Sequence, residues 1–120
     1  MKLVSQPYHS KQCGQACLAM ITEKSLEEVC KDLNNYMDTS IYSEIINYLN
    51  KSGFSTQLVE CLGEDFNKIP NESMVHFMFQ NAATHVAVKF DDLFFDPDVG
   101  IVKEYDNKVK VLRYIKYKKL

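Results

Sequence analysis

The chain has 120 residues, of which 46% are hydrophobic and 25% charged, and its formal net charge is −2. This composition is that of a globular protein and excludes disordered, collagen-like and coiled-coil chains. The balanced charge provides no field that would gather nucleic acid, and the chain has no apolar run of about 18 residues that could span a membrane. We therefore expect a single domain over residues 1–120 with one core, and neither a nucleic-acid partner nor a membrane span.

Three helices are predicted in the first half of the chain. Residues 14–23 carry apolar side chains at helical spacing. Residues 25–33, "SLEEVCKDL", begin with the S-x-x-E pattern of a capping box and continue with an apolar stripe. Residues 40–53 place isoleucine, tyrosine and leucine on one face, and Gly53 supplies a left-handed end to this third helix.

After Gly53 the apolar period changes to two, which predicts an antiparallel sheet of about five or six strands. Asp91 and Asp92 can form a two-residue hairpin turn, and a second hairpin is predicted around residues 106–107. The predicted strands cover residues 54–61, 73–79, 84–90, 93–96, 100–105 and 108–117. Helices first and strands second are typical of the α+β class.

The C-terminal residues 109–119, "VKVLRYIKYKK", are basic and aromatic. Such a stretch could contact nucleic acid, but the alternation of apolar and basic residues favours an edge strand whose lysines prevent pairing with other chains.

The four cysteines show neither a C-x-x-C pair nor histidines at zinc-binding spacing. Residues 1–9 lack the apolar core of a signal peptide, so we expect a cytoplasmic protein with reduced thiols, no disulfide, no metal and no cofactor. Cys17, Cys30 and Cys61 are expected to fill core space as small hydrophobic residues.

Cys13 differs from the other cysteines because it stands at the start of the first predicted helix. Unpaired N–H groups and the helix dipole favour an anion there, so the position suits a thiolate nucleophile. Gly14 allows a close approach of backbone or substrate. An inert cysteine is the alternative, and the partner groups decide between the two interpretations.

A thiolate nucleophile needs an imidazole nearby, and that imidazole needs an acceptor on its far nitrogen. His9 lies in a polar loop and His76 in an apolar strand, where a core histidine with its hydrogen bonds satisfied is the ordinary interpretation. His85 begins a strand whose hairpin partner ends at Asp96. His85 is therefore the candidate base.

A two-residue turn at Asp91 and Asp92 makes Ala87 face Asp96 across the hairpin. His85 shares a face with Ala87, so His85 and Asp96 become diagonal neighbours whose side chains can meet. The alternative is that the segment after residue 95 is only a turn and His85 an exposed strand residue.

An oxyanion formed at the attacked carbonyl needs hydrogen-bond donors. Gln6 and Gln12 both qualify chemically. Gln12 adjoins Cys13 and projects away from it more easily, whereas Gln6 can fold back over the nucleophile from the preceding loop. We favour Gln6.

The segments "QPYHSKQCGQACLAMI" and "HVAVKFDDLFFDPDVG" together resemble the papain-like cysteine peptidases of the bacteriocin-processing type, which cleave leader peptides after a double glycine. The resemblance covers about residues 4–102 and includes free-standing relatives of these peptidases. It implies a papain-like α+β fold, with N-terminal helices packed on a C-terminal antiparallel sheet.

The resemblance also implies roles for four residues: Cys13 as nucleophile, His85 as base, Asp96 as the group that orients His85, and Gln6 as oxyanion donor. The expected function is hydrolysis of a bond in a peptide or protein through a thioester acyl-enzyme. Two alternatives stay open, a catalytically silent module that binds peptides or proteins, and an acyltransferase or deamidase that uses the same residues.

Overall fold

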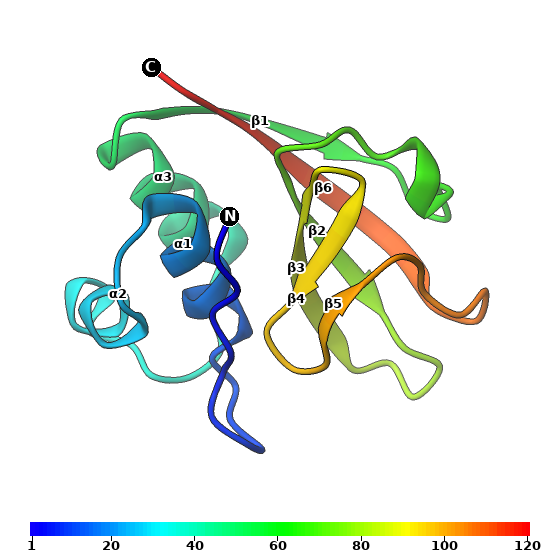
Figure 1. Ribbon diagram of the computed structural model, residues 1–120, viewed down its shortest axis with the longest axis horizontal. Coiled ribbons are helices and arrows are strands. Elements are labelled where there is room, and N and C mark those ends of the chain that lie inside the picture. Colours follow the sequence, from blue (N-terminus) through cyan, green and yellow to red (C-terminus); the bar gives the residue numbers. More distant parts are fainter.

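The computed structural model describes residues 1–120 and places the helical first half against a six-stranded sheet formed by the second half (Figure 1). The helical elements are α1 (Cys13–Thr22), α2 (Leu26–Leu33), η1 (Ile41–Ile46), α3 (Asn47–Lys51) and a short 3-10 turn, η2 (Phe66–Lys68). The strands are β1 (Phe54–Glu60), β2 (Ser73–Met78), β3 (Thr84–Phe90), β4 (Leu93–Asp96), β5 (Gly100–Val102) and β6 (Lys110–Lys119). The predicted α+β class is confirmed.

The helices begin and end close to the predicted positions. The hydroxyl of Ser25 accepts a hydrogen bond from the backbone N–H of Glu28 at 3.1 Å, which is the cap that the sequence predicts for α2. The third predicted helix is divided, because the Ser40 carbonyl accepts from the N–H groups of both Glu44 and Ile45 and η1 begins with wider π-helical turns. No helix has the length and hydrophobicity needed to cross a membrane.

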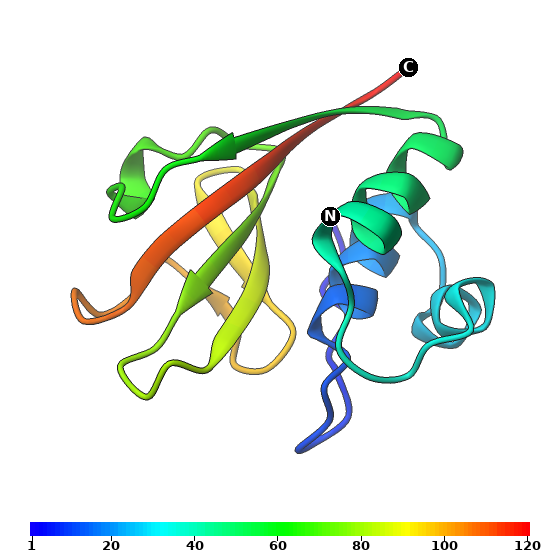
Figure 2. The same ribbon diagram turned by 180° about the vertical axis from the view of Figure 1, so that it is seen from behind.

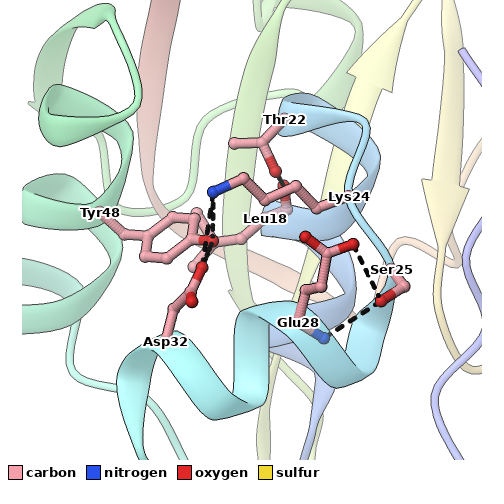
Figure 3. Close-up of polar contacts among 7 residues, drawn as sticks. All are labelled: Leu18, Thr22, Lys24, Ser25, Glu28, Asp32 and Tyr48. Atoms are coloured by element: carbon pink, nitrogen blue, oxygen red, sulfur yellow. Dashed lines mark hydrogen bonds and ion pairs between the residues drawn. The ribbon is translucent and has the colours of Figure 1, made fainter.

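A polar network fixes α2 against its neighbours (Figure 3). The hydroxyl of Tyr48 on α3 donates to Asp32 on α2 at 2.6 Å, and the ammonium of Lys24, just after α1, donates to the Tyr48 oxygen at 3.2 Å. Three helical segments therefore meet at one hydroxyl. Their orientation matters for the site described below, since α1 and η1 form one of its walls.

Side chains alternate between the two faces of the sheet and build two apolar clusters. On β2, Met74 belongs to the cluster beneath the helices and its neighbour Val75 to the cluster on the opposite face. Figure 2 shows the helix layer on one side of the sheet only. The opposite cluster, whose buried members are Ile69, Val75, Phe77, Ala87, Phe94 and Val111, is covered by aromatic side chains from loops of the second half, Phe66 and Tyr105.

The strand order is β1-β6-β2-β3-β4-β5, with every neighbouring pair antiparallel. This order corrects two predictions. Strand β6 is not an edge strand, because it pairs with β1 along one edge and with β2 along the other. Its apolar side chains serve both faces, with Ile115 in one cluster and Val111 in the other. Strand β5 pairs with β4 and not with β6, so the predicted hairpin around residues 106–107 does not form between those two strands.

The β3–β4 hairpin forms as predicted. Both turn residues, Asp91 and Asp92, have positive φ angles of 54° and 61°, as a tight two-residue hairpin turn requires. The observed register places Phe90 opposite Leu93, Lys89 opposite Phe94 and Val88 opposite Phe95. This register brings the first residues of β3 level with the end of β4.

Candidate active site

Cys13 is the first residue of α1 and is partly exposed. The next residue, Gly14, is closely approached by Thr39: a Cβ atom at position 14 would lie 2.0 Å from the hydroxyl oxygen of Thr39. The close approach expected at Gly14 is therefore made by a threonine of the loop that connects α2 to η1. This contact brings that loop beside the sulfur-bearing end of α1.

Gln15 holds the same loop from inside the protein. Its side chain is fully buried, and its amide nitrogen donates to the carbonyls of Asn35 at 3.0 Å and Met37 at 2.8 Å. Two hydrogen bonds from one buried amide to loop carbonyls fix the path of the backbone. Gly14 and Gln15, the two residues after Cys13, thus position the loop that forms one wall of the site.

A cleft of about 290 Å³ opens between this wall and the sheet. Its helical side is formed by Cys13, the α2–η1 loop and η1, and its sheet side by β2 and β3. The residues that line it are Cys13, Asp38, Thr39, Ile41, Ile45, His76, Thr84, His85 and Val86. Two of the three histidines thus lie in the cleft with Cys13, and His9 is exposed on the preceding loop.

His85 and Asp96 meet as the hairpin register predicts. Nε2 of His85 lies 2.6 Å from a carboxylate oxygen of Asp96, and both side chains are buried. The same carboxylate oxygen accepts from the backbone N–H groups of Asp98 at 2.8 Å and Val99 at 3.3 Å. The other oxygen accepts from the hydroxyl of Tyr105 at 2.7 Å. Three donors therefore fix Asp96, and Asp96 in turn binds the far nitrogen of the imidazole.

The pKa values of the pair are shifted in opposite directions. Burial alone would lower the pKa of His85, but its hydrogen bonds to Asp96 and Cys13 and its electrostatic interactions with both groups raise it to about 9. Burial alone would raise the pKa of Asp96, but its hydrogen bond to His85 and the charge of His85 lower it, with further contributions from Tyr105 and Asp98. An imidazolium beside an ionised carboxylate is thus favoured at neutral pH.

The other cysteines have the environment of inert thiols. Cys17 and Cys30 are buried as predicted, whereas Cys61 is only partly buried at the margin of the second cluster. Burial is the main cause that raises the pKa of each of these three thiols. All three therefore stay protonated at neutral pH.

Neither of the two candidate glutamines lines the cleft. The side-chain amide of Gln6 donates to the carbonyl of Ser10 at 2.9 Å, and its backbone N–H donates to the carbonyl of Pro97 at 2.9 Å. The side-chain oxygen of Gln12 faces Cys30, 3.7 Å from its sulfur. The structure brings Cys13, His85 and Asp96 together, and it does not place Gln6 among the residues that line the cleft.

Tyr105 is a site residue that the sequence pattern did not reveal. Its ring packs against Phe66, Phe77 and Phe94 while its hydroxyl reaches Asp96. Burial, followed by the charge of Asp96, raises the pKa of Tyr105, so the hydroxyl stays a donor. The sequence showed only that apolar and polar residues alternate over residues 100–105. This alternation does not show that the side chain of Tyr105 turns inward toward Asp96.

Replacing Tyr105 with phenylalanine should weaken the hold on Asp96. Loss of a buried hydrogen bond to a charged group is expected to lower the free energy of unfolding by about 1.5 kcal/mol. The pKa of Asp96 should rise, so the acid limb of any activity that needs the ionised pair should move to higher pH. Urea denaturation and a pH–rate profile measure the two effects. Tyr114→Phe is the matched control, because Tyr114 packs against the same cluster with no hydrogen bond to Asp96.

No group of three His, Cys, Asp or Glu side chains is arranged as a metal site.

Searches with the sequence find no matching protein-family model and no matching curated protein. The fold itself has clear relatives among solved structures. One is a double-glycine-motif protease from an AMS/PCAT transporter in complex with the leader peptide, with a TM-score of 0.71, 18% identity and coverage of 99% of this chain and 93% of that one.

A second structural relative is the peptidase domain of Streptococcus ComA, a bifunctional ABC transporter involved in a quorum-sensing pathway. Its TM-score is 0.67 with 20% identity, and the match covers 99% of this chain and 98% of that one. Both relatives match over nearly their whole length, helices and sheet included. The chain therefore has the papain-like α+β fold of these two peptidase domains.

Proposed function

We propose that this protein is a cysteine peptidase in which Cys13, His85 and Asp96 act as nucleophile, base and orienting carboxylate. The observation that carries the proposal is the position of Cys13 at a helix start, in one cleft with an imidazole whose far nitrogen is bound to a buried carboxylate. Thiol acyl transfer requires a cysteine next to a histidine, and an acceptor on the other nitrogen of that histidine.

The first half of the proposed reaction forms a thioester. The Cys13 thiolate, stabilised by the imidazolium of His85, attacks the carbonyl carbon of the scissile amide and a C–S bond forms. The carbonyl oxygen becomes an oxyanion, for which the unpaired backbone N–H of Cys13 at the helix start is a suitable donor. The C–N bond then breaks as His85 gives its proton to the leaving amine.

The second half of the reaction releases the product. Neutral His85 accepts a proton from water as the water oxygen attacks the thioester carbon. The C–S bond breaks, the carboxylic acid product leaves, and the thiolate with its imidazolium is restored. Gln6 can assist the oxyanion only if its amide turns from the Ser10 carbonyl toward the cleft, so we assign it a secondary role.

The substrate class proposed is a leader peptide with a double-glycine motif. This assignment rests on one of the two structural relatives, a double-glycine-motif protease in complex with the leader peptide. A Gly-Gly sequence also suits the cleft, because a chain without side chains can pass between closely packed walls.

Alkylation of the full chain by iodoacetamide at pH 7 tests the nucleophile. Cys13 is expected to react at least tenfold faster than Cys61, the other partly exposed cysteine, and far faster than buried Cys17 and Cys30. Peptide mapping by mass spectrometry gives the four rates. A peptidyl-Gly-Gly aminocoumarin amide then measures hydrolysis. Cys13→Ala should abolish both signals, and Cys61→Ser should leave both unchanged.

Three outcomes distinguish the alternatives. Equal and slow alkylation of all four cysteines would contradict the proposed nucleophile. Binding of a Gly-Gly peptide that survives in Cys13→Ala, with no acyl-enzyme in the wild-type protein, would favour a silent binding module. A product joined to an added amine in place of water would identify an acyltransferase.

A further inference from the structure

A row of side chains crosses the sheet where the core beneath the helices ends. Glu60 on β1 is paired with Arg113 on β6. Arg113 is paired in turn with His76 on β2. Side chains directly opposite one another on antiparallel strands project from the same face. The adjacent row on that face is apolar and consists of Leu58, Ile115, Met74 and Val88. The polar row lies beside this core, and it continues on β3 with Val86, which faces His76 and lines the cleft with it.

Arg113 forms hydrogen bonds with both of its neighbours in the row, Glu60 and His76. Its Nε donates to the two carboxylate oxygens of Glu60 at 2.9 and 3.0 Å, and its Nη1 donates to Nδ1 of His76 at 2.5 Å. A guanidinium carries donors and no acceptor, so Nδ1 of His76 must be the acceptor. The proton of a neutral ring then sits on Nε2. The guanidinium thus sets the tautomer of His76.

The surroundings also keep this ring neutral. Burial, followed by the positive charge of Arg113, lowers the pKa of His76 to about 4, and the opposing charge of Glu60 does not reverse the shift. His76 and His85 line one cleft and have opposite partners, a guanidinium and a carboxylate. His76 is thereby a neutral hydrogen-bond donor, whereas His85 can take up and release a proton.

Nε2 of His76 is free to bind a ligand. The ring is partly exposed and lines the same cavity as Cys13 and His85. Its one hydrogen bond is the bond to Arg113, and Nε2 does not belong to the buried polar atoms that lack a partner. The pairing of β2 with β6 also shifts register directly after His76, and such bulges redirect side chains beside functional sites. A ring with one fixed, unpaired N–H donor thus lines the cleft that a substrate would occupy.

We propose that His76 donates a hydrogen bond from Nε2 to a backbone carbonyl oxygen of the peptide in the cleft, with Glu60 and Arg113 holding the ring for this task. This inference rests on the proposed peptidase function. A neutral N–H does not select for charge, and an extended peptide offers a carbonyl oxygen at every residue. His76 is therefore a substrate-positioning contact separate from the chemistry at Cys13.

Two electrophiles distinguish a contribution of His76 to peptide binding from a contribution to the reactivity of Cys13. Iodoacetamide reports only on the Cys13 thiolate, whereas a peptidyl acyloxymethyl ketone that ends in Gly-Gly must also bind the cleft before the thiolate displaces its carboxylate. In His76→Phe, the KI of the ketone should rise about tenfold while kinact and the iodoacetamide rate stay unchanged. His76→Gln keeps one acceptor and one donor and should restore most of the affinity.

The inference is overturned if His76→Phe binds the ketone as tightly as the wild type, or if Gln and Phe at this position weaken binding equally. A fall in kinact or in the iodoacetamide rate would instead mean that His76 supports the thiolate, which also contradicts the proposed role. A wild-type protein that reacts with neither electrophile at Cys13 contradicts the peptidase proposal itself. Thermal denaturation of each variant verifies that the fold is retained.

Discussion

Replacing His85 with alanine is expected to lower hydrolysis of a Gly-Gly aminocoumarin amide by about 10³-fold, because the base and the proton donor of the proposed reaction are lost together. Without the imidazole of His85, Cys13 should react with iodoacetamide no faster than the partly exposed Cys61. His9→Ala is the matched control, because His9 is exposed on the loop before Cys13 and outside the cleft. A His85→Ala variant with near-normal hydrolysis would remove His85 from the mechanism.

The pH dependence follows from the raised pKa of His85. A pKa raised from 6.5 to about 9 means that the charged pair contributes its full stabilisation below about pH 6.5 and loses it as the pH rises through about 9. Hydrolysis should therefore decline above pH 9, when no proton remains for the leaving amine. Alkylation by iodoacetamide should not decline there, since it needs only the thiolate. Parallel pH profiles of the two reactions measure this difference.

Replacing Gly14 with alanine is expected to destabilise the protein by about 1–3 kcal/mol and to slow the alkylation of Cys13. The new Cβ would lie 2.0 Å from the Thr39 hydroxyl and 3.1 Å from its Cβ, so the α2–η1 loop must move away from α1. Without a steric clash, alanine would stabilise the helix by about 1 kcal/mol relative to glycine. A loss of stability would therefore be due to the contact with Thr39, and a gain would mean that the contact is relieved. Urea denaturation measures it.

The double variant Gly14→Ala/Thr39→Ala is the matched test. It removes the hydroxyl and the methyl group that collide with the new Cβ and leaves only the contact at 3.1 Å. We expect it to regain most of the lost stability and alkylation rate, whereas Thr39→Ala alone should change little. A stable Gly14→Ala variant with normal reactivity would show that the close approach of Thr39 does not shape the cleft.

Local features of the chain were predictable because they depend on neighbouring residues. The Ser25 cap, the left-handed Gly53 and the two-residue turn at Asp91 and Asp92 each follow from the preferences of a few side chains. The hairpin turn sets the strand register by simple counting, so the sequence alone predicts the proximity of His85 and Asp96.

Contacts between distant segments were not predictable in the same way. A period of two shows that β6 is a strand and does not show whether one or both of its edges are paired. The alternating lysines of β6 suggested an edge, but its apolar residues serve two cores and two neighbouring strands cover it. Pairing partners are chosen by the packing of the whole sheet, which no short window of sequence contains.

By itself, the sequence determined the α+β class, the helix start at Cys13 and the pairing of His85 with Asp96, since these depend on local preferences and on counting along one hairpin. Only the tertiary structure decided that Tyr105 holds Asp96 and that Arg113 makes His76 a neutral donor. Each of those contacts joins separate segments whose meeting depends on strand order and loop packing. The opposite hydrogen-bond partners of the two histidines in one cleft are thus a property of the folded sheet.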